Sequence, residues 1–380
     1  MIITSGGKAV TDGTHRAVAP EQTWARIRPM FGPAGITRVA DVTRLDTVGI
    51  PVYQAVRPAS LNISVSQGKG VTPLLARISA AMEALELWHA EVVAVASERA
   101  SVRDVRNRLG FDPFALPLHH PHVLDEHVVV DWVAATVVGE SATTLVPRDL
   151  VELDLSVRDC WAPPMFVASS NGLASGNTVD EALLHGMYEL IERDALARHH
   201  SLPISRRPQI ALESVTSGWP RALLDCMERA QLAVTLYDLT GPTGVACFEA
   251  VVHSALFPLP CRGSGAHLDR TVALCRALTE AAQSRLTQIA GARDDLLAVD
   301  YARTDEWVDA PVARTSTGGS RPFTEVVSGG GLTLADDVDD VRRRIQAMTG
   351  GPVLAVDLSR PEVALPVVRV LAPGMQHPTD

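Results

Sequence analysis

Two pairs of glutamates in this sequence have the spacing that places both acids on one face of a helix. The first pair is Glu83-x2-Glu86, and the second is Glu189-x2-Glu192. Residues three or four positions apart lie on the same side of an α-helix. Each segment can therefore present two carboxylates to a single point, which is an arrangement suited to binding a cation.

The residues around both pairs are mostly apolar, since segments 78–85 and 183–191 carry few other polar side chains. A helix that is apolar nearly all round is usually buried, and a buried ionised carboxylate needs a cation or a hydrogen-bonding partner. Hard oxygen ligands favour Mg²⁺, which usually binds together with phosphate. The alternative is ion pairing with Arg77, Arg193 and Arg198. Two matching pairs favour the metal site.

The composition is that of a globular protein with an ample core and no attraction for nucleic acid. The 380 residues are 46% hydrophobic and 21% charged, with a net charge of −10 and no run of Lys or Arg. The five cysteines are scattered without a C-x-x-C pair, so we expect reduced thiols in the cytoplasm. No stretch approaches the roughly 18 apolar residues of a membrane span, so no membrane association is expected.

The hydrophobic pattern predicts both helices and strands. Helices are predicted over 20–30, 72–95, the segment after Thr178, and 270–290. Strands are predicted over 49–56, 128–138, 232–239, 245–253, 353–358 and 363–371. Small-residue loops, 64–70 and 169–176, precede the two carboxylate helices, although this similarity is too slight to establish a repeat. Residues 300–332 are predicted to form a mobile loop.

Two weaker signals have ordinary structural explanations when each is taken alone. Gly68-Lys69-Gly70 is able to cradle phosphate, but a tight turn is the commoner use of such a segment. Arg276, Glu280 and Gln283 share one face of the helix predicted over 270–290, whereas Arg285 falls on another side, where surface arginines are common.

Together these motifs resemble the YcaO family, whose members use ATP to modify peptide backbones. The residues that carry the resemblance span about 60–295 in the family's order and spacing: Gly68-Lys69-Gly70, Ser79-x3-Glu83-x2-Glu86, Ser170-Asn171-Gly172-x-Ala174-x-Gly176, Glu189-x2-Glu192-Arg193-Asp194 and Glu280-x2-Gln283-x-Arg285. Gly13-Thr14-His15-Arg16 and segment 35–43 look like the subgroup that works beside a TfuA partner.

The resemblance implies an α+β fold of mixed sheets packed with long helices, with ATP and Mg²⁺ held between the carboxylate-bearing helices. It implies one domain over 1–380, with its core motifs at 60–295 and a closing segment at 340–380. The implied metal ligands are Glu83, Glu86, Glu189 and Glu192, and the implied catalytic residues are Arg193, Arg285 and Glu280. The implied nucleotide-binding residues are Lys8, Arg16, Lys69, Ser79, Asn171, Arg193, Gln283 and Arg285. The chain departs from many members at Leu87, where they have arginine.

The implied reaction begins when a nucleophile adds to a backbone amide carbon of a peptide substrate. The resulting oxyanion then attacks the γ-phosphate of ATP, and positive charge stabilises the transferring phosphoryl group. External sulfide gives a thioamide, a neighbouring side chain gives an azoline, and a backbone amine gives an amidine. The TfuA-like N-terminal segment, and an ending without a Pro-rich tail, favour the thioamide.

The sequence leaves partners and two other function classes open. We expect a TfuA-like or leader-binding partner protein, and a homodimer is compatible with the chain. A non-catalytic nucleotide-binding subunit and an unrelated ATP-grasp-like ligase are the competing interpretations. The products distinguish them, because phosphoryl transfer gives ADP and phosphate, adenylation gives AMP, and a binding subunit gives neither.

Overall fold

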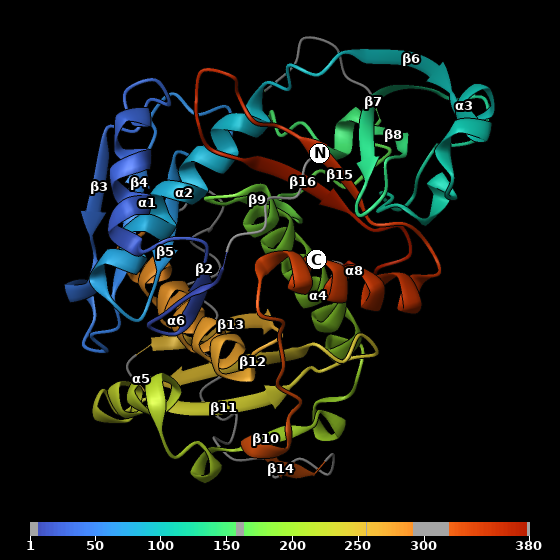
Figure 1. The fold of residues 1–380 in the computed structure, drawn as a ribbon. Coiled ribbons are helices and arrows are strands. Elements are labelled where there is room, and N and C mark those ends of the chain that lie inside the picture. The colour runs from blue at the N-terminus through green and yellow to red at the C-terminus, as the bar shows by residue number, and fades with distance from the viewer. Residues whose placement is uncertain (1–6, 157–162, 256, 292–318, 378–380) are drawn as a thin grey trace.

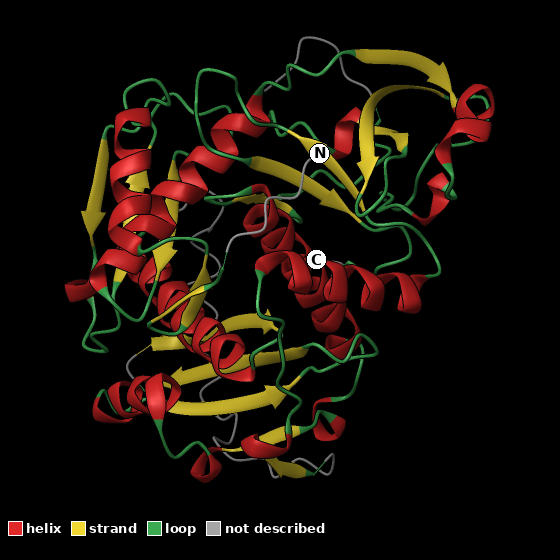
Figure 2. Ribbon diagram, in the orientation of Figure 1, coloured by secondary structure: helices red, strands yellow, loops and turns green. Residues whose placement is uncertain are grey.

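Long helices cross the middle of the protein, and sheets lie around them (Figures 1 and 2). The computed structural model describes residues 7–156, 163–255, 257–291 and 319–377. The helices are α1 (Pro20–Ile27), α2 (Pro73–Glu91), α3 (Val102–Leu109), α4 (Val179–His200), α5 (Gly218–Arg229), α6 (Arg270–Ala290) and α8 (Leu334–Thr349). Among the described residues, no helix combines the length and apolar composition that crossing a bilayer requires.

The strands of the described residues form four sheets. The hairpin is β1 (Ala9–Thr11) with β2 (Thr14–Arg16), and the three-stranded sheet is β3 (Arg38–Asp41), β4 (Val52–Val56) and β5 (Val65–Lys69). The five-stranded sheet has the order β13 (Phe257–His267), β12 (Ala246–Ser254), β11 (Ala233–Asp238), β10 (Gln209–Ala211) and β14 (Ser320–Pro322). The six-stranded sheet has the order β6 (Ser97–Ser101), β7 (Val129–Val137), β15 (Leu354–Asp357), β16 (Val367–Leu371) and β9 (Leu173–Ser175), with β8 (Thr143–Pro147) beside β7. Mixed sheets packed with long helices are the predicted α+β fold, which is confirmed.

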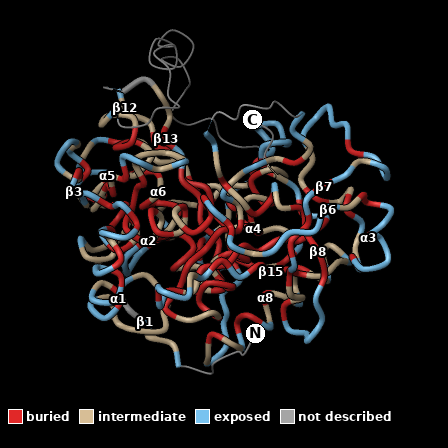
Figure 3. Tube along the Cα trace, turned by 90° about the horizontal axis from the view of Figure 1, so that it is seen from above, coloured by how far each residue is buried: buried red, intermediate tan, exposed pale blue. Residues whose placement is uncertain are grey.

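Three long helices, α2, α4 and α6, are buried at the centre (Figure 3). Each begins at a capping residue: the side chains of Thr72, Thr178 and Asp269 accept hydrogen bonds from backbone N–H groups of the first turn. Apolar residues occur on most sides of these helices because sheets and other helices cover them. Polar side chains on such helices must therefore meet partners inside the protein.

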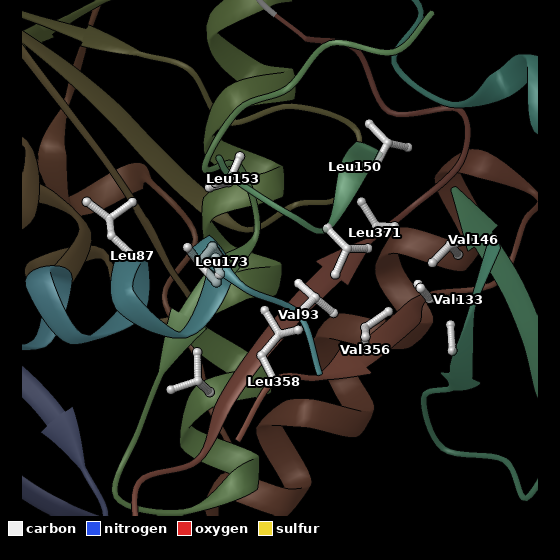
Figure 4. Packing of buried hydrophobic residues seen from close by; sticks show 14 of the residues in the cluster. Leu87, Val93, Val133, Val146, Leu150, Leu153, Leu173, Val356, Leu358 and Leu371 are labelled. Carbon is white, nitrogen blue, oxygen red and sulfur yellow. The ribbon is translucent and has the colours of Figure 1, made fainter. Parts of the chain in front are cut away.

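The hydrophobic core beneath α2 joins this helix to the six-stranded sheet. Figure 4 shows the residues of this cluster side by side: Leu87, Val93, Val133, Val146, Leu150, Leu153, Leu173, Val356, Leu358 and Leu371. They come from α2, from strands β7, β8, β9, β15 and β16 of the sheet, and from the connections between these elements. The packing therefore fixes the end of α2 that carries Glu86 relative to β9 and β16.

Glycines let two strands touch the backbones of the helices that follow them. A Cβ atom on Gly68 of β5 would lie 2.0 Å from the backbone nitrogen of Ala80 in α2. A Cβ atom on Gly263 of β13 would lie 2.1 Å from the nitrogen of Ala281 in α6. No side chain fits in either place, so the strand lies directly on the helix.

Three further glycines show that β9 packs against α4 as β5 packs against α2 and β13 packs against α6. A Cβ atom on Gly70, Gly176 or Gly265 would lie 2.6, 2.5 or 2.8 Å from the backbone nitrogens of Ala76, Ala182 and Ala277, respectively. The sequence separation that joins Gly70 to Gly176 also joins Thr72 to Thr178, Glu83 to Glu189 and Glu86 to Glu192. The chain therefore contains three matched strand–helix units, β5–α2, β9–α4 and β13–α6.

The predicted loop or tight turn at Gly68-Lys69-Gly70 is wrong, because Val65–Lys69 is strand β5 and pairs with β4. Its glycines allow the strand to contact the backbone of α2 and do not form a turn. The loop predicted over 169–176 likewise contains strand β9, Leu173–Ser175. In the region 300–332, residues 300–318 lie outside the described residues, and β14 forms at 320–322.

Replacing Gly263 by alanine is expected to destabilise the protein strongly, because the new methyl group meets the backbone of α6 rather than a movable side chain. We expect the free energy of unfolding to fall by about 3 kcal/mol or more, the upper end of overpacking effects. Urea unfolding followed by circular dichroism measures this. Gly32→Ala is the control, since no heavy atom lies within 4 Å of its added Cβ. Equal stability of the two variants would disprove the close-packed register.

Candidate functional site

A cavity of about 520 Å³ lies where α2, α4 and α6 meet, and hairpin β1–β2 forms part of its wall. Each helix gives the cavity one face, whose residues recur every three or four positions. The polar and charged residues of these faces are Ser79, Glu83 and Glu86 on α2, Glu181, His185, Glu189, Glu192 and Arg193 on α4, and Arg276, Thr279, Glu280, Gln283 and Ser284 on α6. The volume is in the range of small-molecule sites.

Most residues that the sequence singled out lie together in this wall. They are Arg16, Lys69, Ser79, Glu83, Glu86, Glu189, Glu192, Arg193, Glu280 and Gln283. The two glutamate pairs thus face one space from two helices, as their matching positions in β5–α2 and β9–α4 require.

Three candidates make contacts elsewhere. Lys8 forms an ion pair with Asp337 at 2.5 Å. Asn171 lies 2.9 Å from a ring nitrogen of His377. Arg285 donates to Asp46 at 2.6 Å.

Asn177, Glu181, His185 and Arg276 are among the polar wall residues that were not predicted to have a role. The amide of Asn177 and the guanidinium of Arg16 both donate to the carboxylate of Glu181, at 3.2 and 3.3 Å. Arg276 lies 3.3 Å from Nε2 of His185. The sequence could have indicated Arg276 as a wall residue, because it shares one face of α6 with Glu280. Acids are common in the first turn of a helix, so only the packing of α4 shows that Glu181 lies in the cavity wall.

Two carboxylates of the cavity have raised pKa values. Burial raises the pKa of Glu86 to about 8, against hydrogen bonds from Ser175, and nearby Glu83 adds to the rise. Burial also raises the pKa of Glu189, although Arg193 opposes this shift. Protonation is the response of buried acids that have no cation to neutralise them. The cavity is therefore prepared for a cationic ligand.

The two basic side chains near these acids are arranged around Glu280. Lys69 forms an ion pair with Glu280. Burial acts to raise the pKa of Glu280, but Lys69 and Arg193 outweigh it and hold that pKa below its ordinary value. Burial would lower the pKa of Arg193, but Glu192, Glu189 and Glu280 together raise it. Arg193 therefore stays charged, and Lys69 and Arg193 both line the cavity.

The donor set fits Mg²⁺ shared with phosphate better than an ion held by protein alone. Across the described ranges, no three His, Cys, Asp or Glu side chains are grouped closely enough to hold a metal ion. Mg²⁺ typically takes one or two carboxylates and completes its shell with phosphate oxygens and water. Pairs of glutamates that face one cavity from two helices meet that requirement.

Residues 67–376 match the family model described as "YcaO cyclodehydratase, ATP- and Mg²⁺-binding". This chain belongs to the YcaO family. An uncharacterised protein of Mycobacterium tuberculosis is 39% identical over 366 residues, which cover 96% of this chain and 83% of the relative. An uncharacterised protein of the tfuA 3′ region of Rhizobium leguminosarum bv. trifolii is 35% identical over 394 residues, covering 97% and 90%. The family model confirms ATP and Mg²⁺ as the expected cofactors of a YcaO protein.

Solved YcaO structures share the fold. The structure of YcaO from Methanopyrus kandleri bound with AMPPCP and Mg²⁺ has a TM-score of 0.76 and 24% identity, over 97% of this chain and 94% of that one. A heterocyclase in complex with substrate and cofactor has a TM-score of 0.83 and 24% identity, over 99% of this chain. This chain spans 54% of the heterocyclase chain. At these identities the likeness establishes the fold.

Proposed function

We propose that this YcaO protein uses ATP to phosphorylate the oxygen of a peptide backbone amide, and that sulfide is the nucleophile, so that the product is a thioamide. Hydrosulfide adds to the amide carbon and gives a tetrahedral oxyanion. That oxygen takes the γ-phosphoryl group, and ADP leaves. Phosphate is then expelled as the C=S bond forms and the sulfur loses its proton, so amide, hydrosulfide and ATP become thioamide, ADP and phosphate.

The observation that carries the proposal is the cavity lined by carboxylates between helices α2, α4 and α6. Its acids include Glu83, Glu86, Glu189 and Glu192, and its basic side chains include Lys69 and Arg193. Serine, histidine and cysteine nucleophiles are not required, because the phosphoryl group is transferred directly to the substrate oxygen. Since the family match covers 67–376, we also propose that residues 1–380 form one domain.

The roles follow from charge and position. Glu83 and Glu86 on α2, with Glu189 and Glu192 on α4, are the side chains that would hold Mg²⁺. The ion, when bound, neutralises phosphate charge and polarises the transferring group. Arg193 lies beside the acids of α4 and supplies a permanent charge to the phosphates.

The nucleotide is proposed to lie along the remaining wall of the cavity. Lys69 is held by Glu280, which keeps its ammonium group at the wall. Arg16 is held by Glu181 and brings hairpin β1–β2 over the same space. Ser79 and Gln283 offer polar contacts from α2 and α6. Lys8, Asn171 and Arg285 would contact the nucleotide only if their present interactions with Asp337, His377 and Asp46 were broken.

Thioamidation is favoured over azoline and amidine formation by the relative from the tfuA 3′ region, which is 35% identical over nearly the whole chain. The segment Gly13-Thr14-His15-Arg16, which resembles TfuA-associated members, contains strand β2 and the wall residues Gly13, Thr14 and Arg16. We therefore propose a TfuA-like partner protein and a peptide substrate.

ATP turnover by the purified chain tests this function. We expect ADP and phosphate to form only when a pool of synthetic peptides and sulfide are both present, and EDTA to stop the reaction by removing Mg²⁺. A coupled assay for ADP and a phosphate assay measure the products. AMP in place of ADP would point to an adenylating ligase. Nucleotide binding without turnover under any condition would leave a nucleotide-binding subunit.

A further inference from the structure

The three strand–helix units place one polar residue at the same position of each strand. Lys69, Ser175 and Ser264 each stand immediately before the glycine that touches the following helix. Successive residues of a strand face opposite sides. Because the glycine lies against its own helix, the side chain before it is turned so that it can reach a helix of another unit.

The contacts form a ring around the cavity. Ser175 of β9 donates to Oε1 of Glu86 on α2, through its hydroxyl at 2.5 Å and its backbone N–H at 2.9 Å. Ser264 of β13 donates through its hydroxyl to Oε1 of Glu192 on α4 at 2.7 Å. The same hydroxyl lies 3.3 Å from Oε1 of Glu280 on α6, and the backbone N–H of Ser264 donates to that oxygen at 3.3 Å. Lys69 of β5 pairs with an acid of α6 and closes the ring.

The two serine hydroxyls donate to glutamates at matching positions. Glu86 and Glu192 occupy matching positions of α2 and α4, at the same separation from Ala76 and Ala182. Both serines are almost completely buried, with exposed fractions of 2% and 4%. A bond from a serine hydroxyl to the glutamate of another unit therefore occurs at both matching positions, whereas the backbone N–H of Ser175 donates to Glu86 and that of Ser264 donates to Glu280.

We infer that Ser175 and Ser264 are positioning residues that fix the orientation of Glu86 and Glu192 for Mg²⁺. The inference rests on the proposed function, because it concerns the ion of that site. Each serine holds Oε1, which leaves Oε2 as the oxygen for a cation. A carboxylate without this bond rotates about its last side-chain torsion and must be ordered when the ion binds. Partners that orient metal ligands typically contribute about 10- to 100-fold in metal affinity.

The test uses Mn²⁺ as a paramagnetic probe for Mg²⁺, with AMPPCP as a nucleotide that is not hydrolysed. The variants are Ser175→Ala and Ser264→Ala, and free Mn²⁺ is measured by electron paramagnetic resonance. We expect each variant to bind Mn²⁺ about 10- to 100-fold more weakly than the unchanged chain. Thr144→Val is the control: its buried hydroxyl donates to the carbonyl of Leu109 at 2.6 Å, away from the cavity wall. It is expected to lower the melting temperature without changing Mn²⁺ affinity.

A double-variant cycle separates positioning from general stability. In a Glu192→Gln background, Ser264→Ala is expected to cause no further loss of Mn²⁺ affinity, because the group that it orients no longer carries charge. Ser175→Ala should still cause its loss there, since it acts through Glu86. If Ser264→Ala does not fold, the Ser175→Ala measurement decides the question.

The outcomes distinguish the two proposals. If the unchanged chain binds neither AMPPCP nor Mn²⁺, the proposed function fails. If the unchanged chain binds both, but the folded serine variants bind Mn²⁺ equally well, the positioning role is wrong and the proposed function stands. A loss in Ser264→Ala that persists in the Glu192→Gln background would show that the serine acts through the fold and not through the carboxylate, which also overturns the inference.

Discussion

Glu192→Gln is expected to reduce peptide-dependent ATP turnover by at least about a hundredfold while the protein stays folded. Glu192 lies in the cavity wall, nearly buried, and accepts a hydrogen bond from Ser264. Glutamine keeps the volume and can still accept that bond, but it removes the negative charge that a divalent ion requires. Steady-state ADP formation, with circular dichroism as the measure of folding, checks the expectation.

Glu249→Gln provides the matched control for this substitution. Glu249 is equally buried and accepts from Arg262 at 2.9 Å, but it lies outside the cavity wall. Losing its charge should cost stability, because the buried ion pair with Arg262 is lost. Turnover per folded molecule should change little. Undiminished turnover in folded Glu192→Gln, or an equal loss in both variants, would remove Glu192 from the proposed metal ligands.

The glutamates of the site could be predicted because their spacing is a local property. Two residues three apart on a helix share a face whatever surrounds the helix, so Glu83 with Glu86 and Glu189 with Glu192 were recognisable as pairs. The same periodicity placed Arg276 beside Glu280, and the structure has both in the cavity wall.

Residues whose partners come from distant segments were not predictable in this way. Arg285 meets Asp46 from far earlier in the chain, and Lys8 meets Asp337 from far later. No spacing rule reveals such pairs, because they depend on how the sheets bring separate segments together. Glu181 was hidden for a related reason: an acid in the first turn of a helix is common, so it indicates no function by itself.

The fold was predictable in its elements and less so in its packing. Strands β7, β11, β12, β15 and β16 and helix α6 form close to their predicted ranges. Helix α8 was not predicted, although Thr333 and Asp336 form a capping box at its start. Gly68 shows the deeper limit, because a glycine for a turn and a glycine for a close helix contact look alike until the opposing helix is known.

The internal repeat shows the same limit. Only small residues and the two glutamate pairs recur between β5–α2 and β9–α4, and β13–α6 shares little beyond its glycines. Such a pattern is too sparse to recognise in one sequence. In three dimensions the matching contacts of Gly70, Gly176 and Gly265 make it plain, and the carboxylates become parts of one ring instead of two separate motifs.

The mass of the modified peptide should distinguish thioamide formation from azoline formation. With ATP, Mg²⁺ and sulfide, we expect a substrate peptide to gain about 16 Da per modified residue, since sulfur replaces oxygen after phosphoryl transfer. Azoline formation would instead remove water, about 18 Da, and would need no sulfide because its nucleophile is already in the peptide. High-resolution mass spectrometry with and without sulfide measures the difference.

A peptide in which alanine replaces every Cys, Ser and Thr makes this test specific. A thioamide former should modify the alanine peptide as well as the original, because its nucleophile comes from solution. An azoline former should leave it unchanged, since the attacking side chain is gone. Loss of water from the original peptide, independent of sulfide and absent from the alanine peptide, would reject thioamidation. It would preserve ATP-dependent amide activation, because the cavity charges act on the phosphoryl group whichever nucleophile attacks the carbon.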